Sequence, residues 1–278
     1  MEISITSLPG ISLRFASVPE AGGKYATSHL QKGFLLVADG KVLAEEAVGF
    51  GVPVLKRGLQ AVFPGGMTFT TSSRGDVLEI AAVFSLDLEE RFTRTDSNSV
   101  GGPLFYRLKN QMAALIRRVP LLRPVLTGTS SLLRALFGWR TTYERAGFQI
   151  PVQMTYCIDR TTGKMSVTVD LSNLENRGVT EAIVMNEQGA HFFDRYREAG
   201  GSRLFGKRIG TWDAVVAEAA AFECPAAQVA FKLARVEGAH LYRGRELVGS
   251  RLAWSGFGYS FQPGMKIFQY ELTLERLP

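Results

Sequence analysis

Short stretches that alternate apolar and polar residues, separated by turn signals, recur along most of this chain and constrain its fold more than any other feature. Residues 148–158, 164–171 and 265–275 alternate in this way. Asp39-Gly40 and the segment 159–163 are typical of the tight turns that join paired strands. Pro64-Gly65-Gly66 is expected as a turn between two strands, and a strand is expected over residues 246–254. Side chains of a β-strand point to opposite faces in turn, so this pattern predicts antiparallel strands with one buried face. The sequence therefore predicts a mainly β fold, a large antiparallel β-sandwich.

One domain can account for the whole length. The chain has 278 residues, and 46% of them are hydrophobic, which is enough for a sizeable core. All-β sandwiches often reach about 250 residues as one unit. We therefore expect residues 1–278 to form a single β-sandwich domain. Residues 211–223, rich in alanine, fit a helix or a pair of strands equally well.

The pattern changes in the middle of the chain, where residues 103–138 predict a basic helical insertion. Apolar residues recur at helical spacing over 103–119, Pro120 and Pro124 interrupt the pattern, and a second helical segment is expected over 130–138. No Asp or Glu occurs from Ser97 to Tyr143, a stretch with seven Arg and Lys residues. The insertion either covers an open end of the β core or docks on an anionic membrane surface.

The remaining composition narrows the partners and the compartment. Those seven cations account for the formal net charge of +6, so the rest of the surface is close to neutral and a nucleic-acid partner is not expected. The two cysteines lack metal-binding spacing, and the chain shows no secretory signal and no apolar run long enough to span a membrane. We expect a cytoplasmic protein that needs no metal and no cofactor.

The segment from Lys164 to Phe193 resembles the central strands of galactose-mutarotase-like supersandwich proteins. It runs from a strand ending in Val-Asp-Leu-Ser-Asn-Leu174, through Ala-Ile-Val-Met185, to Asn-Glu-Gln-Gly-Ala-His-Phe-Phe193. The resemblance implies a supersandwich fold and a sugar ligand. The sequence departs from that family in having only three histidines and in the basic insertion, which puts the family's usual pair of active-site histidines in doubt.

The densest group of chemically active side chains lies at residues 186–196. If this segment is extended, Glu187, His191 and Arg195 share one face, and Asn186 and Tyr196 lie on the other. A carboxylate beside an imidazole can transfer a proton, and an arginine can neutralise a carboxylated sugar. We therefore predict catalytic roles for Glu187, His191, Arg195 and Tyr196. A solvated edge strand explains the same residues without any site.

Residues elsewhere complete the predicted sugar site. Asn186 and Glu46 supply polar contacts, and Trp212 and Trp254 offer aromatic planes on which a sugar ring can stack. Buried tryptophan packing is the structural alternative for both tryptophans.

Three functions remain open at this level. The first is a carbohydrate-binding or carbohydrate-modifying protein that acts by acid and base chemistry, as a sugar epimerase or a lyase. The second is a non-catalytic carrier of lipid or another hydrophobic ligand, a β-barrel that docks on membranes through residues 103–138. The third is a purely structural or assembly role. Whether the protein is an enzyme is not decided by the sequence.

Overall fold

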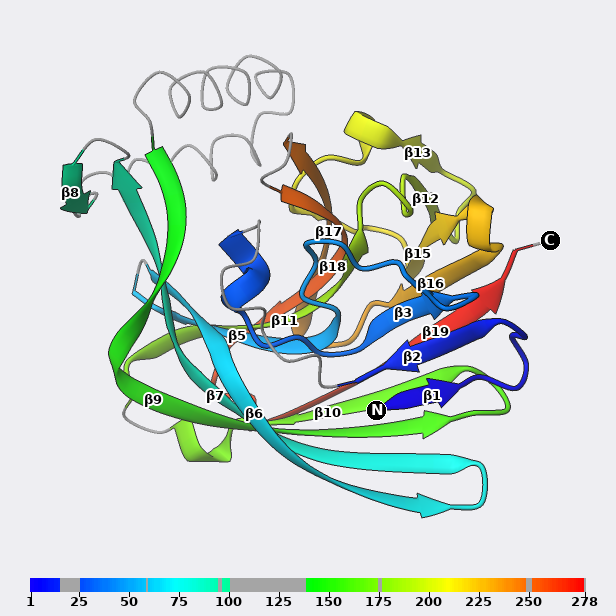
Figure 1. Ribbon diagram of the computed structural model, residues 1–278, viewed down its shortest axis with the longest axis horizontal. Helices are drawn as coiled ribbons and strands as arrows, with labels where there is room; N and C mark the ends of the chain where they lie inside the picture. The colour runs from blue at the N-terminus through cyan, green and yellow to red at the C-terminus, as the bar shows by residue number, and fades with distance from the viewer. Residues whose placement is uncertain are drawn as a thin grey trace.

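A computed structural model of the chain describes residues 1–15, 26–58, 60–94, 97–100, 139–174, 177–248 and 252–277. The described part is mainly β, as predicted, and its strands are all antiparallel to their neighbours (Figure 1). Its helical segments are 3-10 turns of three or four residues. The predicted helical insertion at 103–138, with both of its interpretations, lies outside the described residues.

The strands follow in chain order. They are β1 Glu2–Ser4, β2 Ile11–Arg14, β3 Leu35–Ala38, β4 Lys41–Val42, β5 Phe50–Arg57, β6 Gln60–Arg74, β7 Val77–Arg94, β8 Ser97–Val100, β9 Trp139–Asp159, β10 Lys164–Asp170, β11 Val179–Gly189, β12 Arg195–Glu198, β13 Arg203–Phe205, β14 Asp213–Ala214, β15 Ala219–Cys224, β16 Val229–Ala234, β17 Ala239–Val248, β18 Leu252–Phe261 and β19 Ile267–Arg276. The 3-10 turns are η1 Ala26–His29, η3 Ser172–Leu174, η4 Gly206–Ile209 and η5 Pro225–Ala227.

The strands form two sheets of very different size. The small one has the order β1-β2-β3-β4. The large one has fifteen strands in the order β13-β12-β15-β16-β19-β10-β9-β7-β6-β5-β11-β18-β17-β14, with β8 paired to β7. Burial alternates along β10 and β19 as the sequence pattern predicts. The alanine-rich segment, left open from the sequence, forms strands β14 and β15.

The large sheet folds back on itself, so strands from its two ends pack face to face. Phe257 of β18 lies 4.9 Å from Phe222 of β15 and 6.2 Å from Tyr196 of β12, measured between ring centroids. Arg243 of β17 reaches the carboxylate of Glu198 at 3.6 Å. The main hydrophobic core fills the space between these layers, and Figure 1 shows the long strands β7 and β9 bending along one side of it.

The small sheet closes this core on another side. Phe34, just before β3, and Phe15, just after β2, both contact the ring of Tyr156 on β9. Their ring centroids lie 5.0 and 5.6 Å from that of Tyr156, respectively. Gln188 of β11 joins the two sheets through its amide, which accepts from Leu36 N and donates to Phe34 O, each at 3.0 Å. This buried amide therefore supplies partners for Leu36 N–H and Phe34 C=O, where the two sheets meet.

Two hairpins form where the sequence predicts them, and two other boundaries differ. Asp39 and Gly40 both adopt positive φ between β3 and β4, and residues 160–163 join β9 to β10. Pro64-Gly65-Gly66, expected as a turn, lies inside β6, where the pairing with β7 shifts register as a β-bulge. The single strand expected over 246–254 is instead the junction of β17 and β18.

Candidate functional site

Strand β11 presents different chemistry on its two faces. Asn186 and Gln188 point into the main core, and Met185 and Glu187 point to the other side, because successive residues of a strand alternate. On that other side Met185 packs with Val52 and Val54 of β5 in a second, smaller hydrophobic cluster. We call this surface of β5, β11, β18 and β17 the site face.

Two tryptophans lie on the site face because glycines make room for them. Trp212 lies over Gly258 of β18, where any side chain would overlap its ring. A Cβ atom at Gly244 of β17 would lie 2.7 Å from Trp254 Cη2 and 3.0 Å from Trp212 N. The two indoles are 5.6 Å apart between centroids, tilted by 40°. Trp212 and Trp254, which the sequence analysis assigned to one ligand site, are therefore adjacent in the structure.

Trp212 has an unusual backbone conformation. Its φ is +57°, a left-handed value that is rare for a bulky residue and costs conformational energy. The surrounding contacts hold it in place: Tyr242 packs edge-on against the indole at 6.5 Å, and the ring also contacts the small hydrophobic cluster. Strained residues that the structure supports in this way are concentrated at functional sites.

Glu187 lies in the strand next to this aromatic pair. Its partner across the β11–β18 ladder is Gly256, two residues from both Trp254 and Gly258. The residue is only 4% exposed. Burial raises the pKa of its carboxyl from 4.5 to about 7, and the neighbouring charge of Glu246 adds to the shift, while a Val48 backbone hydrogen bond and Lys32 oppose it. A carboxyl whose pKa lies near neutrality can both accept and donate a proton.

Three residues that the sequence prediction did not include, Lys32, Tyr143 and Glu246, lie near Glu187. Lys32 is buried, and its ammonium donates to the carbonyls of Glu46 and Ala47 at 3.3 and 3.1 Å. Tyr143 of β9 packs on Phe63 at 5.0 Å, and burial together with the charges of Glu90, Glu187 and Glu246 raises the pKa of its hydroxyl well above 10.0. Lys32 precedes β3, Tyr143 lies in β9 and Glu246 lies in β17. These segments come together only in the folded sheet, so no sequence motif groups the three residues.

Glu46, predicted to contact the ligand, belongs to the wall beside Glu187. It is 1% exposed, and Thr27 Oγ1 of η1 donates to its backbone carbonyl at 2.7 Å and to its carboxylate at 3.4 Å. The main chain of the same loop contacts the strand directly, since Glu187 N donates to Gly49 O at 3.0 Å. Glu46 therefore helps to fix the wall, and its backbone anchors Lys32.

The extended ribbon expected over residues 186–196 is interrupted. Strand β11 ends at Gly189 and β12 begins at Arg195, with a turn between them. Within this turn His191 is exposed, and Glu45 accepts from its backbone N–H at 3.1 Å and lies 2.6 Å from its Nδ1. Room for Glu45 exists because Gly189 has no side chain: a Cβ atom there would lie 2.6 Å from Glu45 Oε2. The predicted sharing of one strand face by Glu187, His191 and Arg195 is wrong for this reason.

Arg195 and Tyr196 lie away from the site face. Arg195 is exposed on β12, next to the edge strand β13 of the large sheet. Tyr196 is 1% exposed in the main core, where its hydroxyl donates to Glu198 at 2.8 Å and the Arg243 guanidinium lies over its ring. Burial raises the pKa of that hydroxyl far above its usual range. The structure therefore separates both residues from Glu187, the group they were predicted to assist.

Asn186, predicted as a ligand contact, is also a core residue. It is fully buried, and its Oδ1 accepts from Tyr270 OH at 2.9 Å and from Gly51 N at 3.1 Å. Both lone pairs of this oxygen are therefore used inside the protein. Of the eight residues predicted for the site, the structure brings Glu187, Trp212 and Trp254 together and places Glu46 in the adjoining wall.

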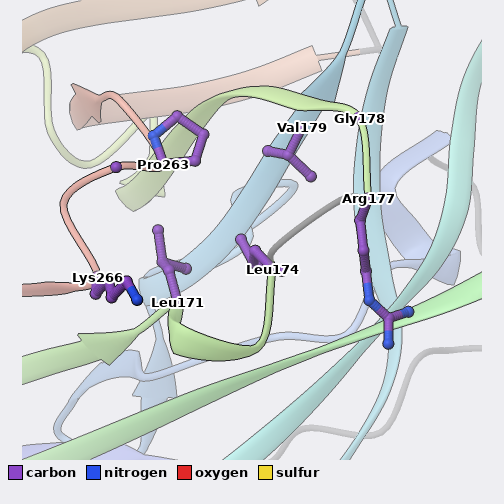
Figure 2. A pocket seen from close by; sticks show the side chains of 8 residues that line it. Leu171, Leu174, Arg177, Gly178, Val179, Pro263 and Lys266 are labelled. Atoms are coloured by element: carbon purple, nitrogen blue, oxygen red, sulfur yellow. The ribbon is translucent and has the colours of Figure 1, made fainter.

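A separate small pocket opens where η3 meets the β18–β19 turn (Figure 2). Its volume is about 270 Å³, and it is lined by Leu171, Leu174, Arg177, Val179, Pro263 and Lys266 among others. Figure 2 shows the Arg177 side chain leading away from the apolar floor, and its guanidinium donates to Gln149 O at 3.2 Å. The predicted site residues do not line this pocket.

Within the described ranges, no three His, Cys, Asp or Glu side chains come close enough together to hold a metal ion. No helix in the same residues is long and apolar enough to cross a membrane.

Comparison with known proteins gives a fold and no family. No protein-family model matches the sequence, and no curated protein matches it. The structure is similar to that of the α-N-acetylgalactosaminidase NagBb from Bifidobacterium bifidum in complex with GalNAc, with a TM-score of 0.52 at 11% identity. The same enzyme in complex with Gal-NHAc-DNJ gives 0.49 at 10% identity, and a protein named HI1317 gives 0.34 at 8% identity over 99% of both chains. The match to NagBb covers 99% of this chain but only 36% of the enzyme, so what is shared is a large β fold.

Proposed function

We propose that the site face binds carbohydrate and that Glu187 transfers a proton to and from the bound sugar. The observation that carries the proposal is the position of a buried carboxyl, with its pKa raised to about 7, beside two tryptophans that lie on glycines. The half-buried ring of Trp212 offers a flat apolar surface to the C–H face of a sugar, with the buried ring of Trp254, 8% exposed, packed against it. Polar groups beside them fix the orientation of the sugar.

The chemical step follows from the protonation state of Glu187. Near neutral pH the carboxyl is present in both forms, so it accepts a proton from a sugar hydroxyl or a carbon-bound hydrogen in one step and returns it in another. Tyr143 keeps its proton at this pH, because the pKa of its hydroxyl is raised, and serves as a neutral hydrogen-bond donor on the same side. Epimerisation at the anomeric carbon and elimination beside a uronate carboxylate both fit this set.

The comparison agrees with a sugar ligand without defining one. NagBb was determined in complex with GalNAc, a neutral sugar, so GalNAc and galactose are reasonable first ligands. Because this chain spans about a third of that enzyme, its glycosidase activity is not carried over. The carrier and assembly functions have no feature on the described residues that favours them over sugar binding.

Ligand-observed NMR with a panel of monosaccharides and oligosaccharides tests the binding claim. We expect saturation transfer from the wild-type protein to at least one sugar, and a loss of at least tenfold in affinity for Trp212→Ala and Trp254→Ala. Phe69→Ala is the control, since Phe69 is an exposed aromatic residue of β6 at 40% exposure and lies outside the site face. Binding that survives both tryptophan substitutions would eliminate the site face as the sugar site.

A second measurement isolates the role of Glu187. Exchange between the two anomers of the bound sugar is followed by NMR, and elimination is followed by the ultraviolet absorbance of the unsaturated product. We expect Glu187→Gln to keep sugar affinity within a few-fold and to abolish whichever reaction the wild type catalyses. A glutamine variant that turns over normally would rule out proton transfer by Glu187.

A further inference from the structure

The edge of the large sheet at β12, β13 and η4 carries a group of exposed cations. Arg195, Arg203, Lys207 and Arg208 are all exposed. No ion pair of theirs is found within the described residues, whereas Arg197, between them, is paired with Glu223 at 2.6 Å and with Glu275 at 2.9 Å. We call the four unpaired cations and Phe205 the basic edge.

The pairing of β12 with β13 gives the basic edge a regular layout. Phe205 lies directly opposite Arg195, and Arg203 lies opposite Arg197. Directly opposed residues of an antiparallel pair project to the same side, and so do residues two apart on one strand. Arg195 and Arg203 therefore border the Phe205 ring, and Phe205 is 51% exposed. Leu204 and Tyr196, the intervening pair, turn inward. The edge thus presents one aromatic face between cationic groups.

The basic edge connects to the site face through the chain at η4, while Tyr196 and Phe257 pack in the core between the two layers that carry them. Lys207 and Arg208 belong to η4, and Trp212 follows four residues after Arg208. The end of η4 is fixed to β17, because Arg243 Nε donates to Ile209 O at 3.2 Å and Arg245 N donates to Gly210 O at 2.8 Å. The same strand supplies Gly244, on which the tryptophans lie.

We propose that the basic edge binds an acidic polysaccharide whose sugar units carry carboxylate or sulfate groups. Guanidinium groups form paired hydrogen bonds with planar carboxylates, and the Phe205 ring supplies a stacking surface for a sugar between them. A membrane surface fits less well, because interfacial binding buries several large apolar side chains and the basic edge exposes only one. The proposal rests on the proposed function and extends it, since it makes the ligand a polymer with negative charge.

Binding to immobilised polygalacturonate at low ionic strength tests the inference. We compare the wild type with a triple variant, Arg203→Gln, Lys207→Gln and Arg208→Gln. The control triple variant, Arg14→Gln, Arg74→Gln and Lys164→Gln, changes the net charge equally on β2, β6 and β10. Exposed ion pairs contribute up to about 1 kcal/mol each, so loss of three corresponds to a decrease in affinity of roughly 10- to 100-fold. We expect that decrease for the edge variant, a decrease below threefold for the control, and weakening of wild-type binding by added salt.

Other polyanions and neutral polymers decide between occupants. Dextran, phosphatidylserine vesicles and duplex DNA are measured under the same conditions, and we expect each to bind at least tenfold more weakly than polygalacturonate. Equal or tighter binding of vesicles or DNA, an equal loss in the control variant, or no wild-type binding to polygalacturonate would each overturn the inference. Circular dichroism and urea unfolding confirm that both variants fold.

The design separates this inference from the proposed function. If small neutral sugars bind and Trp212→Ala abolishes that binding while the edge variant keeps full affinity for polygalacturonate, the proposed function holds and the inference fails alone. If no small sugar binds while the edge variant still loses polygalacturonate affinity, the proposed function fails and the basic edge stands as a separate site.

Discussion

Replacement of Glu187 by glutamine should change the stability of the protein in a pH-dependent manner. Burial raises the carboxyl pKa from 4.5 to about 7, so the folded state binds a proton more tightly than the unfolded state. Between these two values the folded protein holds more protons, and the free energy of unfolding falls as the pH rises. Below pH 4.5 both states are protonated, and above pH 7 both are ionised, so the loss is then complete.

The magnitude follows from the shift. A difference of one pKa unit corresponds to about 1.36 kcal/mol, so ionised Glu187 destabilises the folded state at pH 8 by roughly 3 kcal/mol relative to its protonated form. Glutamine has nearly the same shape and no charge to bury. We therefore expect Glu187→Gln to approach wild-type stability at pH 4.5 and to exceed it by roughly 3 kcal/mol at pH 8.

Urea unfolding of both proteins between pH 4.5 and 8.5 measures the difference. Glu271→Gln serves as the control, because the Glu271 side chain is 53% exposed in an ion pair with Lys164 on the solvent face of β19. Its difference from wild type should change little with pH, since surface pairs contribute at most about 1 kcal/mol. A stability difference for Glu187→Gln that stays constant across this range would refute the raised pKa, and with it the reasoning about proton transfer.

Further predictions concern the glycines and the buried amide next to the site. Gly258→Ala adds a methyl group that would overlap the Trp212 ring. We therefore expect a shifted fluorescence emission maximum of tryptophan, a loss of sugar affinity and a destabilisation of about 1–3 kcal/mol. An unchanged emission spectrum would contradict this expectation. Asn186→Ala leaves Tyr270 OH and Gly51 N–H without their buried acceptor and should cost about 2–3 kcal/mol in urea unfolding, with sugar affinity retained. A loss of sugar binding in a folded Asn186→Ala protein would place Asn186 in the site after all.

The sequence predicts the β class of this protein well because the pattern is local. Alternation along β10 and β19 and the turn at Asp39-Gly40 depend only on neighbouring residues, and hydrophobic periodicity reports them directly. Pro64-Gly65-Gly66 was misassigned because the same residues suit a turn and a β-bulge, and only pairing with β7 distinguishes the two.

The candidate site was predictable in part for the same reason. Glu187, Trp212 and Trp254 stand out by residue type, but nothing local reveals that Lys32, Tyr143 and Glu246 influence the same carboxyl. The interruption at Gly189 is also a tertiary effect, since the turn that follows is shaped by Glu45, far away in sequence. Residues that act together on a sheet come from strands whose order the sequence does not state.

Register explains why Glu187 of β11 faces the tryptophans while its polar neighbours face the core. A shift of one residue would exchange the faces of every side chain in the strand, turning Glu187 into the core and Asn186 to the site face. The two adjacent amides oppose that shift. Asn186 fixes the strand to Gly51 of β5, at the point where the β5–β11 pairing changes register, and Gln188 fixes it to Phe34 and Leu36 of the small sheet. Each amide pairs with buried backbone groups of a neighbouring strand. A one-residue shift would leave these groups without partners inside the core, which costs free energy. The orientation of Glu187 toward the tryptophans is therefore set by the two residues beside it.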